Sequence, residues 1–285
     1  MSGQGGTLRP RAPDAAEAVR LMDAGAVAAL AERLAAQPGL VARRLELDGP
    51  DPGAYFRAPR LLWFVAENPV RTGAMPRNAV AVAQTVIAAA RAEGAPDLGA
   101  DLDTTLGLVA SGRIAREEGQ QAALIAALVA EGAQPDHAMR AALAHRERAA
   151  AEALLAAGAA LTLPAAAGLG RTEAIPALAE AAGEAALHEA LSLAACNGAA
   201  AAVTALLARG ADPDRYNPEG VHAHSAPLHQ AVSIGAAGTV AALLAGGADP
   251  YLPDRVHGGD AWAWAQHCGH PEILALLPPR RHPGG

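Results

Sequence analysis

Lysine is missing from this sequence, and all 22 basic residues are arginines. A chain without lysine has neither a Schiff-base nucleophile nor the lysine of a phosphate-binding P-loop. The arginines form no basic run, and the net charge is −7. Because proteins bind the phosphate backbone mainly through clustered Lys and Arg, we expect no nucleic-acid binding.

Aromatic residues are also scarce, at 3% of the chain, although 52% of the residues are apolar. Much of the apolar content is Ala, with Leu and Val. A thick core is usually built from Phe, Trp and Ile, because these bury the most area per residue. Alanine is the strongest helix former, so the composition predicts an all-α protein with a shallow, extended core.

The sequence has only two cysteines, Cys196 and Cys268. They are too few for a disulfide framework, which favours a reducing compartment. The start of the sequence lacks the apolar stretch of a signal peptide, and no uncharged apolar run is long enough for a membrane helix. We therefore expect a cytoplasmic monomer with no membrane contact. Its ends, residues 1–13 and 279–285, are predicted to be disordered.

Motifs of common catalytic and cofactor sites are absent as well. The sequence contains no G-x-S-x-G, HExxH or CxxC. Gly168-Leu169-Gly170 lacks the third glycine and the preceding strand of a dinucleotide-binding loop, so we interpret it as a turn. We expect no enzymatic activity and no cofactor.

What the sequence does have is self-similarity near its C-terminus. Three segments align on Gly198, Gly235 and Gly269, which are 37 and 34 residues apart. Such a spacing accommodates two short helices and a loop. Each glycine predicts a tight turn after a first helix, and the apolar stripe that follows predicts a second helix. Because one unit cannot bury its stripe alone, neighbouring units must cover it.

These segments resemble the ankyrin repeat. Residues 226–231, Ala-Pro-Leu-His-Gln-Ala, match the family's T-P-L-H-x-A signature except at the Thr. The Gly-Ala-Asp-Pro sequences at 210–213 and 247–250 match its G-A-D-x pattern. The resemblance implies that His229 bonds to loop backbone. At the Thr position, Ala226 costs about 1 kcal/mol of helix capping unless Ser225 substitutes.

The resemblance implies an ankyrin-type α-solenoid of about eight helix-turn-helix repeats with short hairpin-like loops. It is specific over residues 183–278. Residues 14–182 are assigned to degenerate helical repeats from helix periodicity and turn residues alone.

Ankyrin proteins bind partners through a concave face made of loop tips and first-helix ends. The resemblance therefore implies a protein–protein interaction module with an unidentified protein partner. The candidate partner-binding residues in this register are Cys196, Asn197, Tyr216, Asn217, His222, Ser225, Ser233, Ile234, His257, His267 and Cys268.

The segment 215–225 is the most unusual part of this set. It lengthens one loop by about three residues relative to a 34-residue spacing. Long loops with polar and aromatic residues often bind partners, so it is either a recognition loop or a stabilising insert.

Two other hypotheses remain open. His222, His224, His257, His267 and Cys268 could converge on one face and bind a metal or a small ligand, although their spacing lacks a CxxC pair. An enzyme site could instead lie around Trp63, Glu67 and Asn68 in the N-terminal half.

Overall fold

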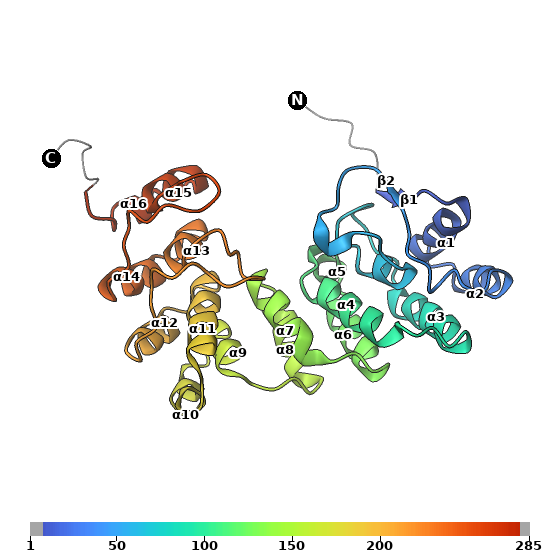
Figure 1. Ribbon diagram of the computed structural model, residues 1–285, viewed down its shortest axis with the longest axis horizontal. Coiled ribbons are helices and arrows are strands. Elements are labelled where there is room, and N and C mark those ends of the chain that lie inside the picture. The colour runs from blue at the N-terminus through green and yellow to red at the C-terminus, as the bar shows by residue number, and fades with distance from the viewer. Residues whose placement is uncertain (1–7, 280–285) are drawn as a thin grey trace. The chain divides into compact units, whose positions relative to one another are not determined.

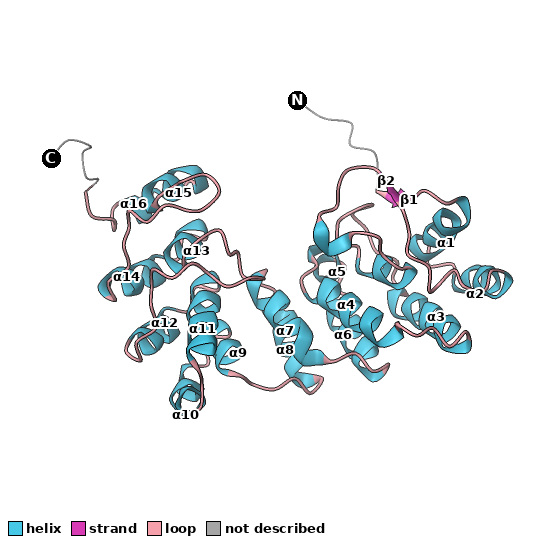
Figure 2. Ribbon diagram, viewed as in Figure 1, coloured by secondary structure: helices cyan, strands magenta, loops and turns pink. Residues whose placement is uncertain are grey.

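Helices packed in sequential pairs make up most of the fold (Figure 1). A computed structural model describes residues 8–279. Helix accounts for 57% of the structure and strand for 1%, which confirms the predominantly helical class expected from the sequence (Figure 2). The chain divides into two compact units. Unit 1 runs to Ala142 and includes Ala149–Ala159, and unit 2 comprises Leu143–Arg148 and the chain from Ala160 onwards.

Unit 1 combines a short antiparallel sheet with a series of helices. Its elements are β1 (Arg9–Pro10), α1 (Pro13–Asp23), α2 (Val27–Ala36), β2 (Leu47–Asp48), η1 (Ala54–Phe56), η2 (Leu61–Ala66), α3 (Ala79–Ala92), α4 (Leu98–Ala110), α5 (Arg113–Glu117), α6 (Gln121–Ala130) and most of α7 (Pro135–Ala144) and α8 (Arg148–Ala156). Here α1 packs on α2, η2 on α3, and α4 on α6. The first helices of successive pairs contact one another in the order α1, η2, α4. The second helices of the pairs do so in the order α2, α3, α6.

Unit 2 repeats this two-row packing. Its elements are α9 (Leu163–Gly168), η3 (Thr172–Ala174), α10 (Ile175–Glu180), α11 (Glu184–Cys196), α12 (Ala200–Leu207), α13 (Pro227–Ser233), α14 (Ala237–Ala245), α15 (Ala261–Cys268) and α16 (Pro271–Leu274). The pairs are α9/α10, α11/α12, α13/α14 and α15/α16. The first members contact one another in chain order, and so do the second members. Each pair is therefore covered by the next one along the chain.

The turn glycines expected from the sequence have the required backbone. Gly198 and Gly269 have φ values of +71° and +75°. Gly235, between α13 and α14, has φ +65°, and a Cβ there would lie 2.7 Å from His270 Nδ1. Both the left-handed backbone and the adjoining pair thus require glycine at this position.

The core of unit 2 is made of Leu, Val and many Ala side chains. Leu206 and Leu243, from the predicted second-helix stripes, are fully buried. Alanines such as Ala194, Ala231 and Ala265 are also fully buried on the first-row helices. Small side chains let these helices approach closely, which fits the shallow core inferred from the composition.

The N-terminal segment differs from expectation. Residues 8–13, predicted to be disordered, contain the buried Leu8 and strand β1, in which Arg9 pairs with Asp48. The disorder predicted for residues 1–7 and 280–285 lies outside the described residues. At Pro279 the backbone carbonyl accepts a hydrogen bond from Tyr251 Oη at 2.6 Å. None of the helices within residues 8–279 is long and apolar enough to cross a membrane.

Candidate functional site

Two neighbouring loops of unit 2 are attached to each other along their length. They are loop 214–226, before α13, and loop 249–260, before α15. The amide of Asp249 donates to Asp214 Oδ1 at 2.7 Å, and the amide of Arg255 donates to the His224 carbonyl at 2.7 Å. These bonds join the starts of the two loops and connect the end of loop 214–226 to the middle of loop 249–260.

A side-chain clamp adds to this attachment. Tyr216 Oη donates to the Pro253 carbonyl at 2.5 Å. The Arg255 guanidinium lies over the Tyr216 ring, 3.9 Å from its centroid. A cation over an aromatic face is stabilised by the ring quadrupole. Tyr216, in the segment interpreted from the sequence as either a recognition loop or a stabilising insert, thus holds its loop to the neighbouring loop.

Asp254 organises the tip of loop 249–260. Its Oδ1 accepts from the amides of Val256 and His257 at 2.9 and 2.7 Å. Its Oδ2 accepts from the Gly259 amide at 2.8 Å and from Trp264 Nε1 at 3.0 Å. Burial disfavours the carboxylate, but these four hydrogen bonds outweigh that effect and lower the Asp254 pKa. Both carboxylate oxygens are therefore bonded within the loop and to helix α15.

Trp264 links the tip of loop 249–260 to His224 and His229. Its indole ring stacks on the His224 ring at a centroid distance of 6.1 Å and meets the buried His229 ring at 5.2 Å. His229 Nδ1 accepts from the Ala226 amide at 3.1 Å, and Nε2 lies 3.0 Å from the Leu252 carbonyl. Burial lowers the pKa of His229, so its ring is held in the neutral form.

A hollow of about 660 Å³ opens beside these groups. Its lining residues come from both loops and from α15: His224, Asp254, His257, Gly259, Ala263, Trp264, His267 and Cys268. His257 and His267 are exposed, whereas His224, Trp264 and Cys268 are half-buried. The hollow thus presents imidazoles, an indole and a thiol on a fixed frame.

The hollow does bring together four of the five residues in the metal hypothesis, all but His222. Within the described part of the chain, however, no group of three or more His, Cys, Asp or Glu is placed to hold a metal ion. Cys196 and Cys268 are both free thiols.

Three predicted site residues are buried, and their assignment to an exposed face is wrong. Cys196 has no exposed surface, because its place in the last turn of α11 faces the packed helices. Asn217 and Ser225 close the base of loop 214–226, where the Asn217 amide donates to the Ser225 carbonyl at 2.9 Å. Ser225 Oγ accepts from Gln230 Nε2 at 2.8 Å, so Ser225 does not cap α13.

Other predicted residues are half-buried and bonded within unit 2. His222 Nε2 lies 3.0 Å from the Ala144 carbonyl. Asn197 Nδ2 donates to the Leu143 carbonyl at 2.8 Å, and Ser233 Oγ to the Gln230 carbonyl at 2.8 Å. Ile234 is half-buried near Gly198. These four lie outside the lining of the hollow.

Four lining residues were missed by sequence reasoning: Asp254, Gly259, Ala263 and Trp264. An Asp shortly before Gly258-Gly259 is a signal for a side chain that binds turn amides, which could have identified Asp254. Ala263 carries no such signal, because only the fold brings this small apolar residue to the lining of the hollow.

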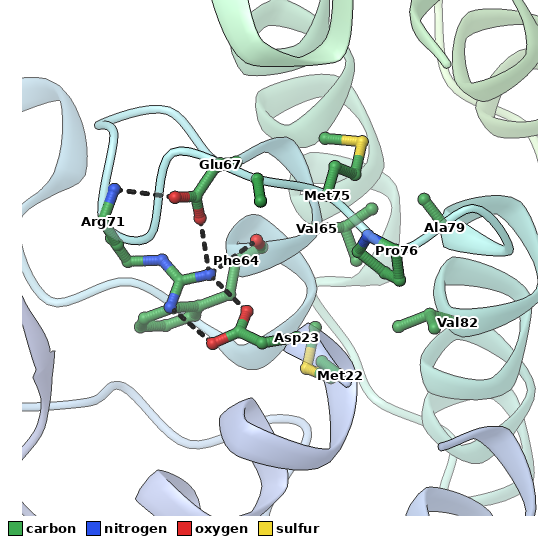
Figure 3. A pocket seen from close by; sticks show the side chains of 11 residues that line it. Met22, Asp23, Phe64, Val65, Glu67, Arg71, Met75, Pro76, Ala79 and Val82 are labelled. Atoms are coloured by element: carbon green, nitrogen blue, oxygen red, sulfur yellow. Dashed lines mark hydrogen bonds and ion pairs between the residues drawn. The ribbon is translucent and has the colours of Figure 1, made fainter. Parts of the chain in front are cut away.

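Glu67, one of the residues of the enzyme hypothesis in unit 1, holds a loop in place (Figure 3). Glu67 Oε1 accepts from the amides of Arg71 and Gly73 at 2.8 and 3.0 Å. The buried Arg71 guanidinium pairs with Glu67 Oε2 at 2.8 Å and with Asp23 Oδ1 at 2.7 Å. The cavity beside this network measures only about 10 Å³, which is room for about one water molecule.

The Trp63 and Asn68 side chains also form hydrogen bonds within unit 1. Trp63 Nε1 donates to Asp101 Oδ1 at 3.0 Å, and Asn68 Nδ2 donates to the Leu108 carbonyl at 3.0 Å. These contacts explain why polar side chains occur here in a buried part of the fold.

No protein-family model matches the chain, and no curated protein sequence matches it.

Proposed function

We propose that the chain is an ankyrin-type protein-interaction module, which binds a segment of a partner protein in the hollow beside loops 214–226 and 249–260. The observation that carries the proposal is the mutual attachment of the two loops around a hollow of about 660 Å³. The proposal includes no catalytic step, cofactor or metal.

The ankyrin assignment is supported by the residues of α13 and by the packing order. His229, the histidine of the signature-like sequence, bonds to the backbone of loop 249–260, as the resemblance implies. The sequential pairs lie in two rows, with first members beside first members. A stack of helix-turn-helix repeats requires this order, because each unit buries its apolar face against the next.

The attachment of the loops supports a binding role on energetic grounds. A flexible loop loses conformational entropy when it binds, and this loss weakens the complex. Here Asp254 and Tyr216 already hold both loops before any partner arrives. The frame around the hollow is therefore preorganised, and less of the interaction energy is lost to ordering.

The chemistry of the surface also suits a protein partner. Val256, 62% exposed at the tip of loop 249–260, is adjacent to His257 at the edge of the hollow. Trp264 is half-buried and rigidly held. Interfaces often combine a fixed aromatic anchor with a polar rim, and the imidazoles supply that rim.

A pair of variants tests the proposal. Ala263→Trp places a bulky side chain in the hollow, while Ala201→Trp places the same side chain on an exposed position of α12. We expect partner proteins captured from a lysate by the wild-type chain and by Ala201→Trp to be lost with Ala263→Trp. For a purified partner, the affinity should fall at least about tenfold, since filling a central pocket removes a hot spot.

Melting curves of both variants should match that of the wild type, because each substitution is at a position that is not fully buried. Partner capture that is identical for Ala263→Trp and Ala201→Trp would contradict the proposal.

A further inference from the structure

We infer that the partner segment held in the hollow is acidic, and that its carboxylates bind the protonated imidazoles of His224, His257 and His267. This inference rests on the proposed function and specifies the chemistry of the partner. The net charge of the chain and the residue types that line the hollow differ.

The chain as a whole is acidic, with a net charge of −7. The hollow, in contrast, is lined by three histidines and by a single acidic residue, Asp254. Both oxygens of Asp254 already accept hydrogen bonds from the loop and from Trp264, and Asp254 is only 4% exposed. A ligand in the hollow therefore meets imidazoles rather than an open carboxylate.

The charges on the elements around the hollow are mixed. The titratable and charged groups are Asp214, Arg215, Tyr216, Glu219, His222 and His224 from loop 214–226, Asp249, Tyr251, Asp254, Arg255, His257 and Asp260 from loop 249–260, His267 and Cys268 from α15, and His229 from α13. Acids among them are bonded within the fold: Asp214 Oδ1 accepts from the Asp249 amide at 2.7 Å, and Asp260 Oδ1 caps α15 by accepting from the Ala263 amide at 2.9 Å. The exposed Arg255, adjacent to the hollow, keeps a permanent positive charge.

Recognition of an acid by imidazole depends on the pH. Histidine is the side chain that gains a proton between pH 8 and pH 5. His229 is buried and burial lowers its pKa, so it is not among the groups proposed to bind the partner. A carboxylate placed among them favours the protonated form, and binding therefore takes up protons.

The expected pH dependence follows from that proton uptake. Binding at pH 6 should be stronger than at pH 8 by roughly sixfold for each histidine whose pKa rises by about one unit in the complex. Two participating histidines multiply to roughly fortyfold. Salt should weaken the complex, because charges at an open surface are screened.

The test is a selection with displayed random peptides. The full-length chain is immobilised at pH 6, and the library is first depleted on the Ala263→Trp variant, so that the remaining binders depend on an open hollow. We expect the selected peptides to be enriched in Asp and Glu. Fluorescence anisotropy of individual peptides at pH 6 and pH 8 then measures the change in Kd.

Matched variants assign the effect to the lining histidines. His257→Gln with His267→Gln should remove most of the pH dependence, while His137→Gln, at an exposed histidine of unit 1, should retain it. Replacing Glu by Gln in a selected peptide should weaken binding at pH 6.

The outcomes separate the two proposals. Selected peptides without acidic enrichment, with equal Kd at both pH values, would overturn the acidic partner and leave the interaction module standing. A selection in which no peptide distinguishes the wild type from Ala263→Trp would count against both.

Discussion

The indole Nε1–H of Trp264 donates a hydrogen bond to Asp254 Oδ2 at 3.0 Å and ties the tip of loop 249–260 to helix α15. Gly259 is the residue that lets the two approach. A Cβ at this position would lie 3.0 Å from Asp254 Oδ2 and 3.2 Å from Trp264 Cδ1. The Asp254–Trp264 bond thus joins two residues that line the hollow.

Asp254→Asn should destabilise unit 2 by about 2 kcal/mol, because an amide nitrogen cannot accept the bonds that one carboxylate oxygen now accepts. Urea unfolding measures the loss. Glu219→Gln, on the exposed part of loop 214–226, is the matched control and should leave stability unchanged.

Lowering the pH should remove the contribution of Asp254 to folding stability over a defined pH range. The pKa of Asp254 is lowered below the ordinary value of 3.8, so the folded state binds this proton more weakly than the unfolded state. The contribution is thus fully present above about pH 5 and is lost as the pH falls through 3.8 towards the folded-state pKa. Melting temperatures measured between pH 5 and pH 2 should fall less steeply for Asp254→Asn than for the wild type.

Two buried histidines predict a second pH dependence at milder acidity. Burial is the main reason that the pKa values of His188 and His229 are lowered below 6.5. Below pH 6.5 the unfolded chain takes up protons that the folded chain resists, so stability falls as the pH falls. The melting temperature should decline from pH 7 to pH 5.

His188→Gln should flatten that decline, because Gln does not titrate and still offers a donor to the Tyr216 carbonyl, now 2.9 Å from His188 Nε2. His137→Gln, at an exposed position, serves as the control. An unchanged slope for His188→Gln would be inconsistent with this explanation.

The two thiols should differ in reactivity. Burial raises the pKa of the Cys196 thiol to about 12, whereas Cys268 is half-buried beside the hollow. Because the thiolate is the reactive form, the folded chain should titrate with one equivalent of a disulfide reagent at pH 8. Cys268→Ser should abolish the reaction until the chain is unfolded. Rapid modification of Cys196 in the folded Cys268→Ser variant would refute the prediction.

Arg71→Ala should destabilise unit 1 by about 3 kcal/mol or more, since it leaves Glu67 and Asp23 without their cation. The Glu67 and Arg71 side chains are each only 3% exposed. Arg113→Ala removes the exposed pair with Glu117 and should cost less than about 0.5 kcal/mol. Thermal unfolding followed by circular dichroism compares the two. Equal shifts would argue against a structural role for the buried network.

Much of the fold could be inferred from local sequence patterns. Gly198, Gly235 and Gly269 occupy left-handed turns, as their place between a first and a second helix predicted. Leu206 and Leu243 are buried because the apolar stripe of a helix must face a neighbour. Strand β1 was not anticipated, since two residues are too short for any alternating pattern to emerge.

The residues of the candidate site could be predicted only in part from the sequence, because the exact register of a helix decides which side chains are exposed. Cys196 lies two residues before its turn glycine, but Cys268 lies one residue before Gly269. In an α-helix, a shift of one residue turns a side chain by about 100°. Cys196 therefore points into the packed helices while Cys268 reaches the hollow. Asp254 acts through folded loop geometry, which spacing in the sequence does not encode.

The close contact between Gly235 and His270 bears on how such a chain can change over time. A side chain at position 235 would collide with a residue of the following pair, and Gly25 stands in the same relation to Asn78 in unit 1. Each of these pairs is thus fitted to its own successor. Duplicating, deleting or exchanging one of these helix pairs should therefore create a mismatched junction and lower the stability of the chain.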